Sequence, residues 1–330
     1  MRLSRFKRGG VHPADSKRYT CDVPVTQIAA PPTLTLMLRQ NIGAPSRAVV
    51  KAGMHVSRGD LVAEAGGFVG APVHSPVSGV VKGIERVRDL SGYWAEAIII
   101  VCDDDAGIQS ELYADVTDEM FADACLSLTS EEIIQRISSA GVVGLGGASF
   151  PTHVKLSVPE GKRVDTLVLN GAECEPYLTC DDRLMRERPE DVIRGALLLS
   201  LACRAQRIVI GVEANKPEAI RRLGEAKYEF EEICRRLERR VEIIPLRTRY
   251  PQGSEKQLIQ AVTGRIVPVG GLPVDVRCVV DNVATVFAAL QAVVLQRPLT
   301  SRIVTVTGPE LKNPGNFVVD NGTSYRHLIE

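Results

Sequence analysis

The sequence predicts an α/β protein in which a domain built on a mainly parallel sheet follows a smaller β-rich domain. From about Tyr113 to Leu299, short β-branched segments alternate with single helices, which is the pattern of a parallel sheet covered by helices on both faces. Up to about Asp105 the sequence is instead rich in Gly, Pro and Val and has little helical periodicity. A final β-branched strand, Arg302–Thr307, and the turn Asn321-Gly322 open a third segment.

The amino-terminal region carries closely spaced turn signals, and short strands between such turns are typical of a small β-sandwich or barrel. The turns are Ala52-Gly53, Arg58–Asp60, Gly66-Gly67 and Ser78-Gly79. The region resembles a biotinyl/lipoyl-type barrel-sandwich, but its hairpin tip, Gly66–Gly70, has no lysine to carry a prosthetic group. We therefore expect this domain to act as a scaffold or docking module.

Each element of the α/β region has its own local signal. Thr129–Glu132 is a capping box that opens a helix ending at Gly141, and Pro189 begins a helix that runs through Leu201. The remaining strands are expected at Thr166–Leu169, Arg207–Val212, Val241–Pro245 and Val276–Val280, and the remaining helices from Pro217 into the charged stretch Glu229–Arg240, at Glu255–Val262 and at Val283–Leu295. The chain ends at Glu330 where another helix begins, so we expect a truncated form of a longer protein.

Composition excludes several classes of protein. Of the 330 residues, 45% are hydrophobic and 24% are charged, as in ordinary globular proteins. The 40 basic residues equal the 40 acidic ones, so we expect no nucleic-acid partner. No apolar run reaches the roughly 20 residues of a membrane span, so we expect no transmembrane segment. The basic stretch Met1–Gly10 lacks the apolar run of a secretory signal and is expected to be a solvated tail.

The eight cysteines include no Cys-x-x-Cys pair, so local spacing predicts neither a zinc site nor an iron–sulfur cluster. Cys174 and Cys180 flank an acidic turn and are expected to be free thiols. We predict no metal site in this chain.

The strongest local signal is the glycine-rich stretch Gly144–Lys155. Glycines at this density let a backbone approach a flat or phosphorylated ligand, because no Cβ stands in the way. Phe150 would flank an aromatic ring and Lys155 would meet a phosphate. A tight turn without a ligand is the alternative.

Three further motifs follow predicted strands, where ligands of open α/β sheets bind. They are Asn170–Tyr177, Tyr250–Lys256 and Asp281–Thr285. The first offers an amide and two carboxylates, and the last offers the amides and positive dipole of a helix start. Alone, each has an ordinary explanation as an acidic turn, a capped helix start or an N-cap.

Together these four motifs resemble the flavin-binding 51-kDa subunit of respiratory complex I. With Gly9–Pro13, Asn41–Pro45 and Ala71–Gly79, essentially the whole chain resembles the C subunits of Rnf electron transport complexes. The resemblance implies a barrel-sandwich domain at 1–112, a Rossmann-like FMN/NADH domain at 113–299 and the beginning of an SLBB-type β-grasp segment at 300–330.

The resemblance also implies noncovalent FMN, with NADH bound over the flavin ring. By matched position, the residues expected around FMN are Gly144, Gly146, Gly147, Lys155, Asn170, Glu173, Tyr250, Gly253, Asn282 and Thr285. Those expected to contact NADH are Phe150, Glu175 and Glu255. The complex I pattern has an arginine, an aspartate and a glutamate where this chain has Leu145, Ala172 and Ser254, so those polar contacts are not carried over.

The implied function is that of an NADH-dependent flavoprotein oxidoreductase, the electron-input or reversible output subunit of the membrane-bound Rnf translocase. A hydride would pass between nicotinamide C4 and flavin N5, with no catalytic acid or base from the protein, and electrons would leave singly. The family continues into a region with two [4Fe–4S] clusters, whose ligands this chain lacks. The implied partners are NADH and other Rnf subunits, especially the iron–sulfur B subunit, at the cytoplasmic face of the cell membrane.

Two alternatives remain open on sequence alone. A flavoprotein cobalamin reductase shares the flavin-binding motifs. A non-redox scaffold protein of a membrane electron-transport complex would keep the architecture without the flavin, although the intact glycine loop and Asn170–Glu175 disfavour it.

Overall fold

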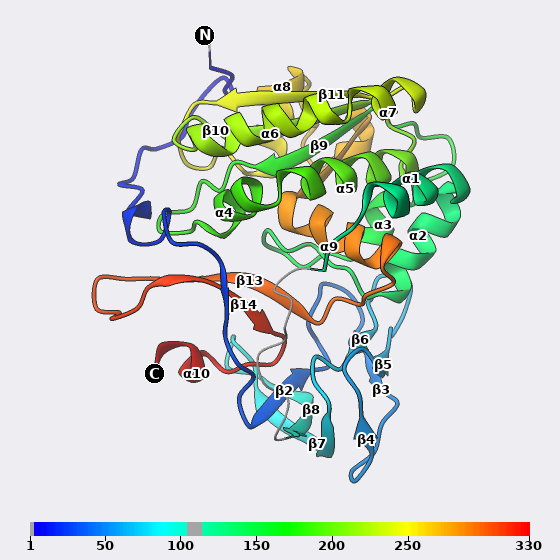
Figure 1. Cartoon of the computed structure of the whole chain (residues 1–330), viewed down its shortest axis with the longest axis vertical. Helices are drawn as coiled ribbons and strands as arrows, with labels where there is room; N and C mark the ends of the chain where they lie inside the picture. The colour runs from blue at the N-terminus through cyan, green and yellow to red at the C-terminus, as the bar shows by residue number, and fades with distance from the viewer. Residues whose placement is uncertain (1–2, 104–113) are drawn as a thin grey trace.

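The computed structural model describes residues 3–103 and 114–330. In Figure 1 the α/β unit fills the upper half and the amino-terminal β strands fill the lower half. A small sheet that contains the carboxy-terminal strands lies between them. The predicted fold class is confirmed.

The α/β unit is built on four parallel strands in the order β11-β10-β9-β12. These strands are β9 (Thr166–Gly171), β10 (Arg207–Glu213), β11 (Arg240–Leu246) and β12 (Cys278–Asn282). Their β-branched and aliphatic side chains are buried on both faces, as expected for a parallel sheet.

Helices cover the two faces unequally. They are α1 (Asp118–Ser127), α2 (Ser130–Ser139), α3 (Thr152–Leu156), α4 (Cys180–Glu187), α5 (Pro189–Ala202), α6 (Pro217–Glu229), α7 (Glu231–Arg236), α8 (Glu255–Thr263) and α9 (Val283–Val294). Leu167 and Leu169 of β9 belong to the large core that includes α5 and α9. Val168 points the other way, into a smaller core with α8. The period-two alternation of β9 therefore supplies both cores.

Most predicted elements are confirmed, and the capping box at Thr129 is present with both of its hydrogen bonds. The turn expected between Cys174 and Cys180 is present, but the helix α4 that begins at Cys180 was not predicted. Leu184 and Met185 of this helix are fully buried, but a single buried pair is too short a pattern to predict a helix. The helix expected to run from Pro217 into the charged stretch ends at Glu229, and the short α7 follows it.

The amino-terminal strands form two small sheets, β2-β8-β7-β4 and β3-β5-β6, which confirms the predicted barrel-sandwich. The strands are β2 (Thr33–Met37), β3 (Arg47–Ala48), β4 (His55–Val56), β5 (Leu61–Glu64), β6 (Val73–His74), β7 (Gly79–Arg88) and β8 (Trp94–Cys102). Their shared core includes Leu34, Val62 and Ile98, none of which is exposed.

The expectation of a solvated amino-terminal tail holds for the exposed side chains of Arg5, Lys7 and Arg8, but it was wrong for Phe6 and for the backbone, which is hydrogen-bonded to the α/β unit. Ser4 N donates to Pro245 O (3.1 Å), and Val11 and Tyr250 exchange two backbone hydrogen bonds of 2.8 and 2.9 Å. Phe6 is buried. The segment therefore extends the α/β unit at its β11 edge before the chain reaches the β strands (Figure 1).

The third sheet joins the two ends of the chain. Strand β1 (Thr26–Gln27) pairs in parallel with β14 (Gly315–Asp320), which is antiparallel to β13 (Ser301–Val306), and α10 (Tyr325–Ile329) follows. The strand expected at Arg302–Thr307 is confirmed. The domain limits 1–112, 113–299 and 300–330, and the β-grasp identity of the last, stay predictions.

Close packing of two helices in the α/β unit leaves no room for a side chain at one glycine. A Cβ at Gly195 of α5 would lie 2.5 Å from the carbonyl oxygen of Val286 in α9. We expect Gly195→Ala to lower the free energy of unfolding by about 1–3 kcal/mol through overpacking. A Cβ at Gly224 of α6 would meet nothing within 4 Å, so Gly224→Ala should raise it by about 0.5–1 kcal/mol. Chemical denaturation of both variants measures this, and equal effects would contradict the packing argument.

Candidate functional site

The topology of the sheet creates one position where the chain changes direction. Strands β9, β10 and β11 progress outward in order, and β12 then returns to the opposite side of β9. Crevices outside such switch points are the usual binding sites of open α/β sheets. Here the last paired residues of the two strands are Asn170 and Asn282, which are direct neighbours in register.

The glycine loop lies directly beside this switch point. Gly144 N donates to Phe150 O (2.9 Å), which closes the loop, and Leu145 N donates to Thr285 Oγ1 (2.9 Å) at the start of α9. A Cβ at Gly146 would lie 2.8 Å from Cβ of Asn282, so the loop and the strand end are in tight contact. Residues 146–148 are exposed, and their amides donate no hydrogen bond within the described part of the chain. The loop therefore presents free N–H groups.

Asn282 links the switch point to two neighbours. Its Oδ1 accepts from Ala284 N (2.8 Å) and so caps α9, as an ordinary N-cap does. Its Nδ2 donates to Asp181 Oδ2 (2.6 Å) at the start of α4. Burial raises the pKa of Asp181 to about 6, although the hydrogen bond from Asn282 opposes that rise.

Asn170 fixes a third loop at the same place. Its Nδ2 donates to Gly253 O (2.8 Å), and its Oδ1 accepts from Ala172 N (3.2 Å). Gly253 N in turn donates to Cys174 Sγ (3.2 Å). The motifs that follow β9 and β11 are thus hydrogen-bonded to each other beside Asn282.

Lys155 lies among acidic groups. Its Nζ donates to Val280 O (2.9 Å) and is 3.4 Å from Oδ1 of the fully buried Asp281. Burial raises the pKa values of Asp281 and Glu255, and Lys155 opposes both shifts. The predicted phosphate contact Lys155 and the predicted NADH contact Glu255 therefore share one electrostatic environment.

Glu175 and Tyr250 form another predicted pair. The Tyr250 side chain is hydrogen-bonded to Glu175, and that carboxylate raises the pKa of Tyr250. Glu175 is exposed, so its second oxygen remains accessible to a ligand. Phe150 is half-buried beside the glycine loop.

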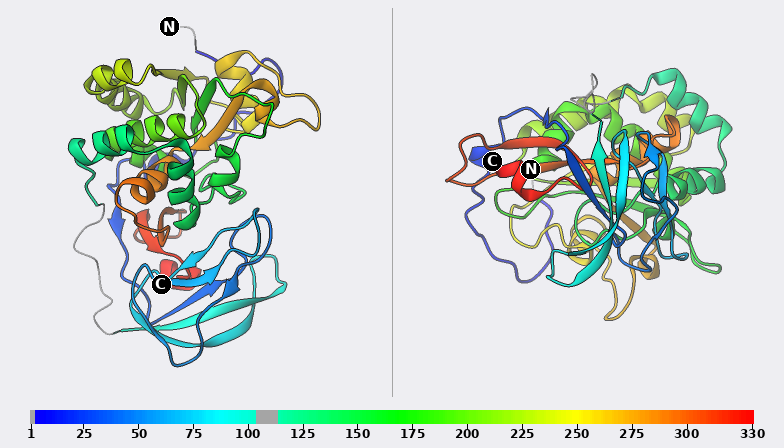
Figure 2. Two further views of the ribbon diagram at one scale, coloured as in Figure 1. Left: turned by 90° about the vertical axis from the view of Figure 1, so that its right-hand side faces the viewer. Right: turned by 90° about the horizontal axis from the view of Figure 1, so that it is seen from below.

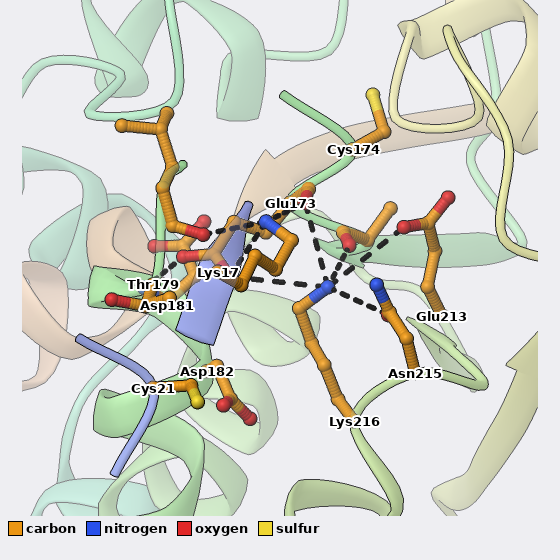
Figure 3. A network of polar contacts seen from close by, with 12 residues as sticks. Lys17, Cys21, Glu173, Cys174, Thr179, Asp181, Asp182, Glu213, Asn215 and Lys216 are labelled. Atoms are coloured by element: carbon orange, nitrogen blue, oxygen red, sulfur yellow. Dashed lines mark hydrogen bonds and ion pairs between the residues drawn. The ribbon is translucent and has the colours of Figure 1, made fainter. Parts of the chain in front are cut away.

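Glu173 is turned into a buried network of charges (Figure 3). Its Oε2 lies 3.7 Å from Nζ of Lys17 and 3.9 Å from Nζ of Lys216, and its Oε1 accepts from Asp181 N (2.7 Å). Only 2% of its side-chain surface is exposed. Burial raises the pKa of Glu173 to about 8, against the opposing effects of Lys216 and Lys17. The carboxyl group of Glu173 points to these two lysines. Its assignment to FMN stays a prediction.

The two lysines clamp the loop that follows β9. Lys17 Nζ donates to the carbonyl oxygens of Glu173 (2.9 Å), Glu175 (3.0 Å) and Leu178 (2.5 Å). Lys216 Nζ donates to Ala172 O (2.7 Å). Buried charges are tolerated when hydrogen bonds and counter-charges surround them, and both lysines meet that condition.

Neither lysine was predicted from the sequence. Lys216 comes three residues after the end of β10, so the rule that ligand-binding residues follow parallel strands would have pointed to it. Lys17 is 156 positions from Glu173 and has no local signal. Asp181 was not singled out because α4, in whose first turn it lies, was not predicted.

Comparisons with known proteins agree with this geometry. A family model described as the Nuo51 FMN-binding domain matches residues 137–291, and one described as the RnfC barrel sandwich hybrid domain matches residues 5–105. The C subunit of the proton-translocating ferredoxin:NAD(+) oxidoreductase complex of Clostridium ljungdahlii is 40% identical, over 98% of this chain and 67% of the relative. Its counterpart in the Na(+)-translocating complex of Acetobacterium woodii is also 40% identical, over 98% of this chain and 70% of the relative.

The chain belongs to the RnfC family, the C subunits of Rnf complexes. It is thus similar to subunits of ion-translocating oxidoreductase complexes. A longer member from Pseudomonas aeruginosa is 40% identical, and this chain spans 40% of its length. The crystal structure of an NAD+-reducing [NiFe]-hydrogenase in the H2-reduced state shares the fold, with a TM-score of 0.55 and 23% identity over 61% of this chain and 38% of the hydrogenase chain.

Other surface features of this RnfC family member lie away from the switch point. One hollow is lined by charged residues at the opposite, amino-terminal end of the strands, including Asp165 and Arg207. Another is lined by Arg5, Lys7 and Arg247. Within residues 3–103 and 114–330, no three His, Cys, Asp or Glu side chains are grouped to hold a metal ion. In the same ranges, no helix has the length and apolar character needed to cross a bilayer.

The raised pKa of Glu173 gives a pH dependence with a definite sign. Because the folded pKa is about 8 and the ordinary value is 4.5, the folded protein holds a proton that the unfolded chain releases between these values. The free energy of unfolding should therefore fall as pH rises from about 5 to about 8. Glu173→Gln should flatten this fall, whereas Glu160→Gln on the surface should keep it. Denaturation curves at several pH values measure this, and parallel curves for wild type and Glu173→Gln would reject it.

Proposed function

We propose that this chain is the NADH-binding, FMN-containing part of an RnfC protein, which takes electrons in or returns them reversibly. The observation that carries the proposal is the meeting of Asn170 and Asn282 at the switch point, beside a glycine loop with free amides. The matching FMN-binding family model and the ferredoxin:NAD(+) oxidoreductase names of the relatives support it.

The donor set suits FMN. The free amides of residues 146–148 and the positive end of α9 are the groups that proteins use to hold phosphate. A Cβ at Gly147 would meet nothing within 4 Å, so this stretch of the loop leaves space for a ligand. Asn170 and Gly253 supply a flat polar edge of amide groups.

The protein's own task is to bind, orient and exclude water. Bound FMN would supply the hydride and single-electron chemistry between NADH and an iron–sulfur acceptor. Lys155 would provide positive charge near the phosphate, while Glu175 and Glu255 would hydrogen-bond the nicotinamide nucleotide. The two lysines behind Glu173 keep the loop between β9 and α4 in place. Preorganisation of this kind lowers the cost of reaching the reactive geometry.

The acceptor and the location that we propose are those that the family resemblance implies. We propose that electrons pass to iron–sulfur clusters of the longer protein and then to other Rnf subunits, among them the iron–sulfur B subunit. The protein would act at the cytoplasmic face of the membrane as a peripheral subunit. No observation favours a cobalamin reductase, and the intact glycine loop disfavours a scaffold without flavin.

The proposal is tested by an absorption spectrum before and after addition of FMN and NADH. We expect the protein to take up FMN and NADH to bleach the flavin absorption. If the protein does not bind added FMN, the result would favour the alternative of a scaffold protein without flavin.

Removal of Lys155 should weaken FMN binding. A lost charge-assisted hydrogen bond to phosphate corresponds to about a tenfold or larger rise in the FMN dissociation constant. Lys162, whose surface partner is Asp275, provides the control. Fluorescence titration of Lys155→Ala and Lys162→Ala with FMN measures the difference, and unchanged affinity in the first would remove Lys155 from the site.

Glu175→Gln should separate NADH from FMN. We expect slower reduction of the flavin by NADH, because a carboxylate acceptor is lost, and nearly unchanged FMN retention. Rapid-mixing kinetics and FMN titration on the same preparation measure the two effects. Equal loss of both would show that Glu175 is needed for the flavin pocket itself.

A further inference from the structure

The hairpin tip of the β domain presents an unusual aromatic side chain. Phe68 lies between β5 and β6 within Gly66–Gly70, and 68% of its surface is exposed. The other six phenylalanines of the chain are buried or half-buried. A ring left so open has no partner in its own domain that would explain it.

The tip is held firmly even though the ring is exposed. His153 Nε2 lies 3.0 Å from the carbonyl oxygen of Phe68, and the two rings meet edge to face with centroids 5.8 Å apart. The carbonyl oxygen of Val69 accepts from Ala44 N (3.0 Å). A Cβ at Gly43 would lie 2.0 Å from that same oxygen, so only glycine fits there.

The tip is fixed beside the glycine loop of the α/β unit. His153 is in α3, which directly follows that loop. A second β-domain loop touches it too, since Ile42 N donates to Ser149 O (3.4 Å). The left view of Figure 2 shows the blue loops of the β domain reaching up to the α/β unit. Phe68 therefore lies at the edge of the proposed nucleotide site, on the side of the β domain.

We propose that Phe68 stacks on the adenine of NADH, so that the barrel-sandwich domain forms one wall of the nucleotide site. This inference rests on the proposed function. NADH has two flat ring systems, and its nicotinamide must reach the flavin at the switch point near Asn170 and Asn282. The adenine lies at the other end of the dinucleotide. The exposed Phe68 ring, which the β domain holds beside the glycine loop, could therefore stack on it. Stacking of a base on an aromatic ring is a strong contact that needs no particular hydrogen bonds.

The test compares NADH with reduced nicotinamide mononucleotide, which lacks the adenylate half of NADH. The protein is loaded with FMN, and flavin reduction is followed at increasing concentrations of each donor. In Phe68→Ala we expect the half-saturating concentration of NADH to rise about tenfold, and that of the mononucleotide to stay unchanged. Phe68→Tyr should restore NADH use. Leu90→Ala, at an 83% exposed position on the β7–β8 hairpin, is the matched control and should behave as wild type.

Three outcomes overturn the inference in different ways. If Phe68→Ala uses NADH as well as wild type does, the ring faces something other than adenine, such as a partner protein. If the half-saturating concentrations of both donors rise equally, Phe68 only supports the loop. If wild-type protein holds FMN but NADH does not reduce it, the proposed function fails as well. Retention of FMN by Phe68→Ala, measured first, shows that the site is folded, because the bond to His153 uses the backbone carbonyl.

Discussion

The return of β12 to the free side of β9 is the constraint on which the site depends. In a parallel sheet this return places two strand ends side by side, and here the last residues paired between the two strands are both asparagines. Asn170 holds the loop after β11 through Gly253, while Asn282 holds α4 through Asp181 and begins α9. Two amide side chains thus bind the surrounding loops into one arrangement. A one-residue shift of β12 would turn Asn282 to the opposite face of the sheet and break both sets of contacts.

The lysine network has a complementary role behind this arrangement. The loop after β9 is irregular, and Glu173 within it has a φ of 46°. Lys17 and Lys216 supply donors to the carbonyl groups of this loop, and Glu173 Oε2 lies within 4 Å of both ammonium groups. The loop is therefore fixed from inside the protein and leaves its outer side for a ligand. Because Lys17 belongs to the amino-terminal segment, that segment is a structural part of the α/β unit although it precedes the β domain.

The features predicted from sequence are those encoded by neighbouring residues. The capping box at Thr129, the strand before Asn170 and the glycine loop each need only a short window. The sequence also predicted that the motifs lie together, because the carboxyl ends of parallel strands share one edge of the sheet. Lys17 could not be predicted, since its partner Glu173 is 156 positions away and a lysine side chain is ordinarily solvated. The orientation of Glu173 was equally hidden, because the same sequence would place its carboxylate outward if no lysines lay behind it.

The β domain contributes more than a support for the site. Its contact with the α/β unit is close, as a Cβ at Gly141 would lie 2.4 Å from the carbonyl oxygen of Pro72. The carbonyl oxygen of Phe68 lies 3.0 Å from His153 Nε2, and its ring meets that of His153 only edge to face, so most of the side chain remains exposed. A barrel-sandwich without a lysine at its tip has no use as a carrier, but a rigid tip beside a glycine loop is well suited to complete a binding site. With Phe68 in the role that we propose, the two domains would form one binding unit, in which the sheet edge positions the reactive end of the nucleotide and the hairpin positions the other end.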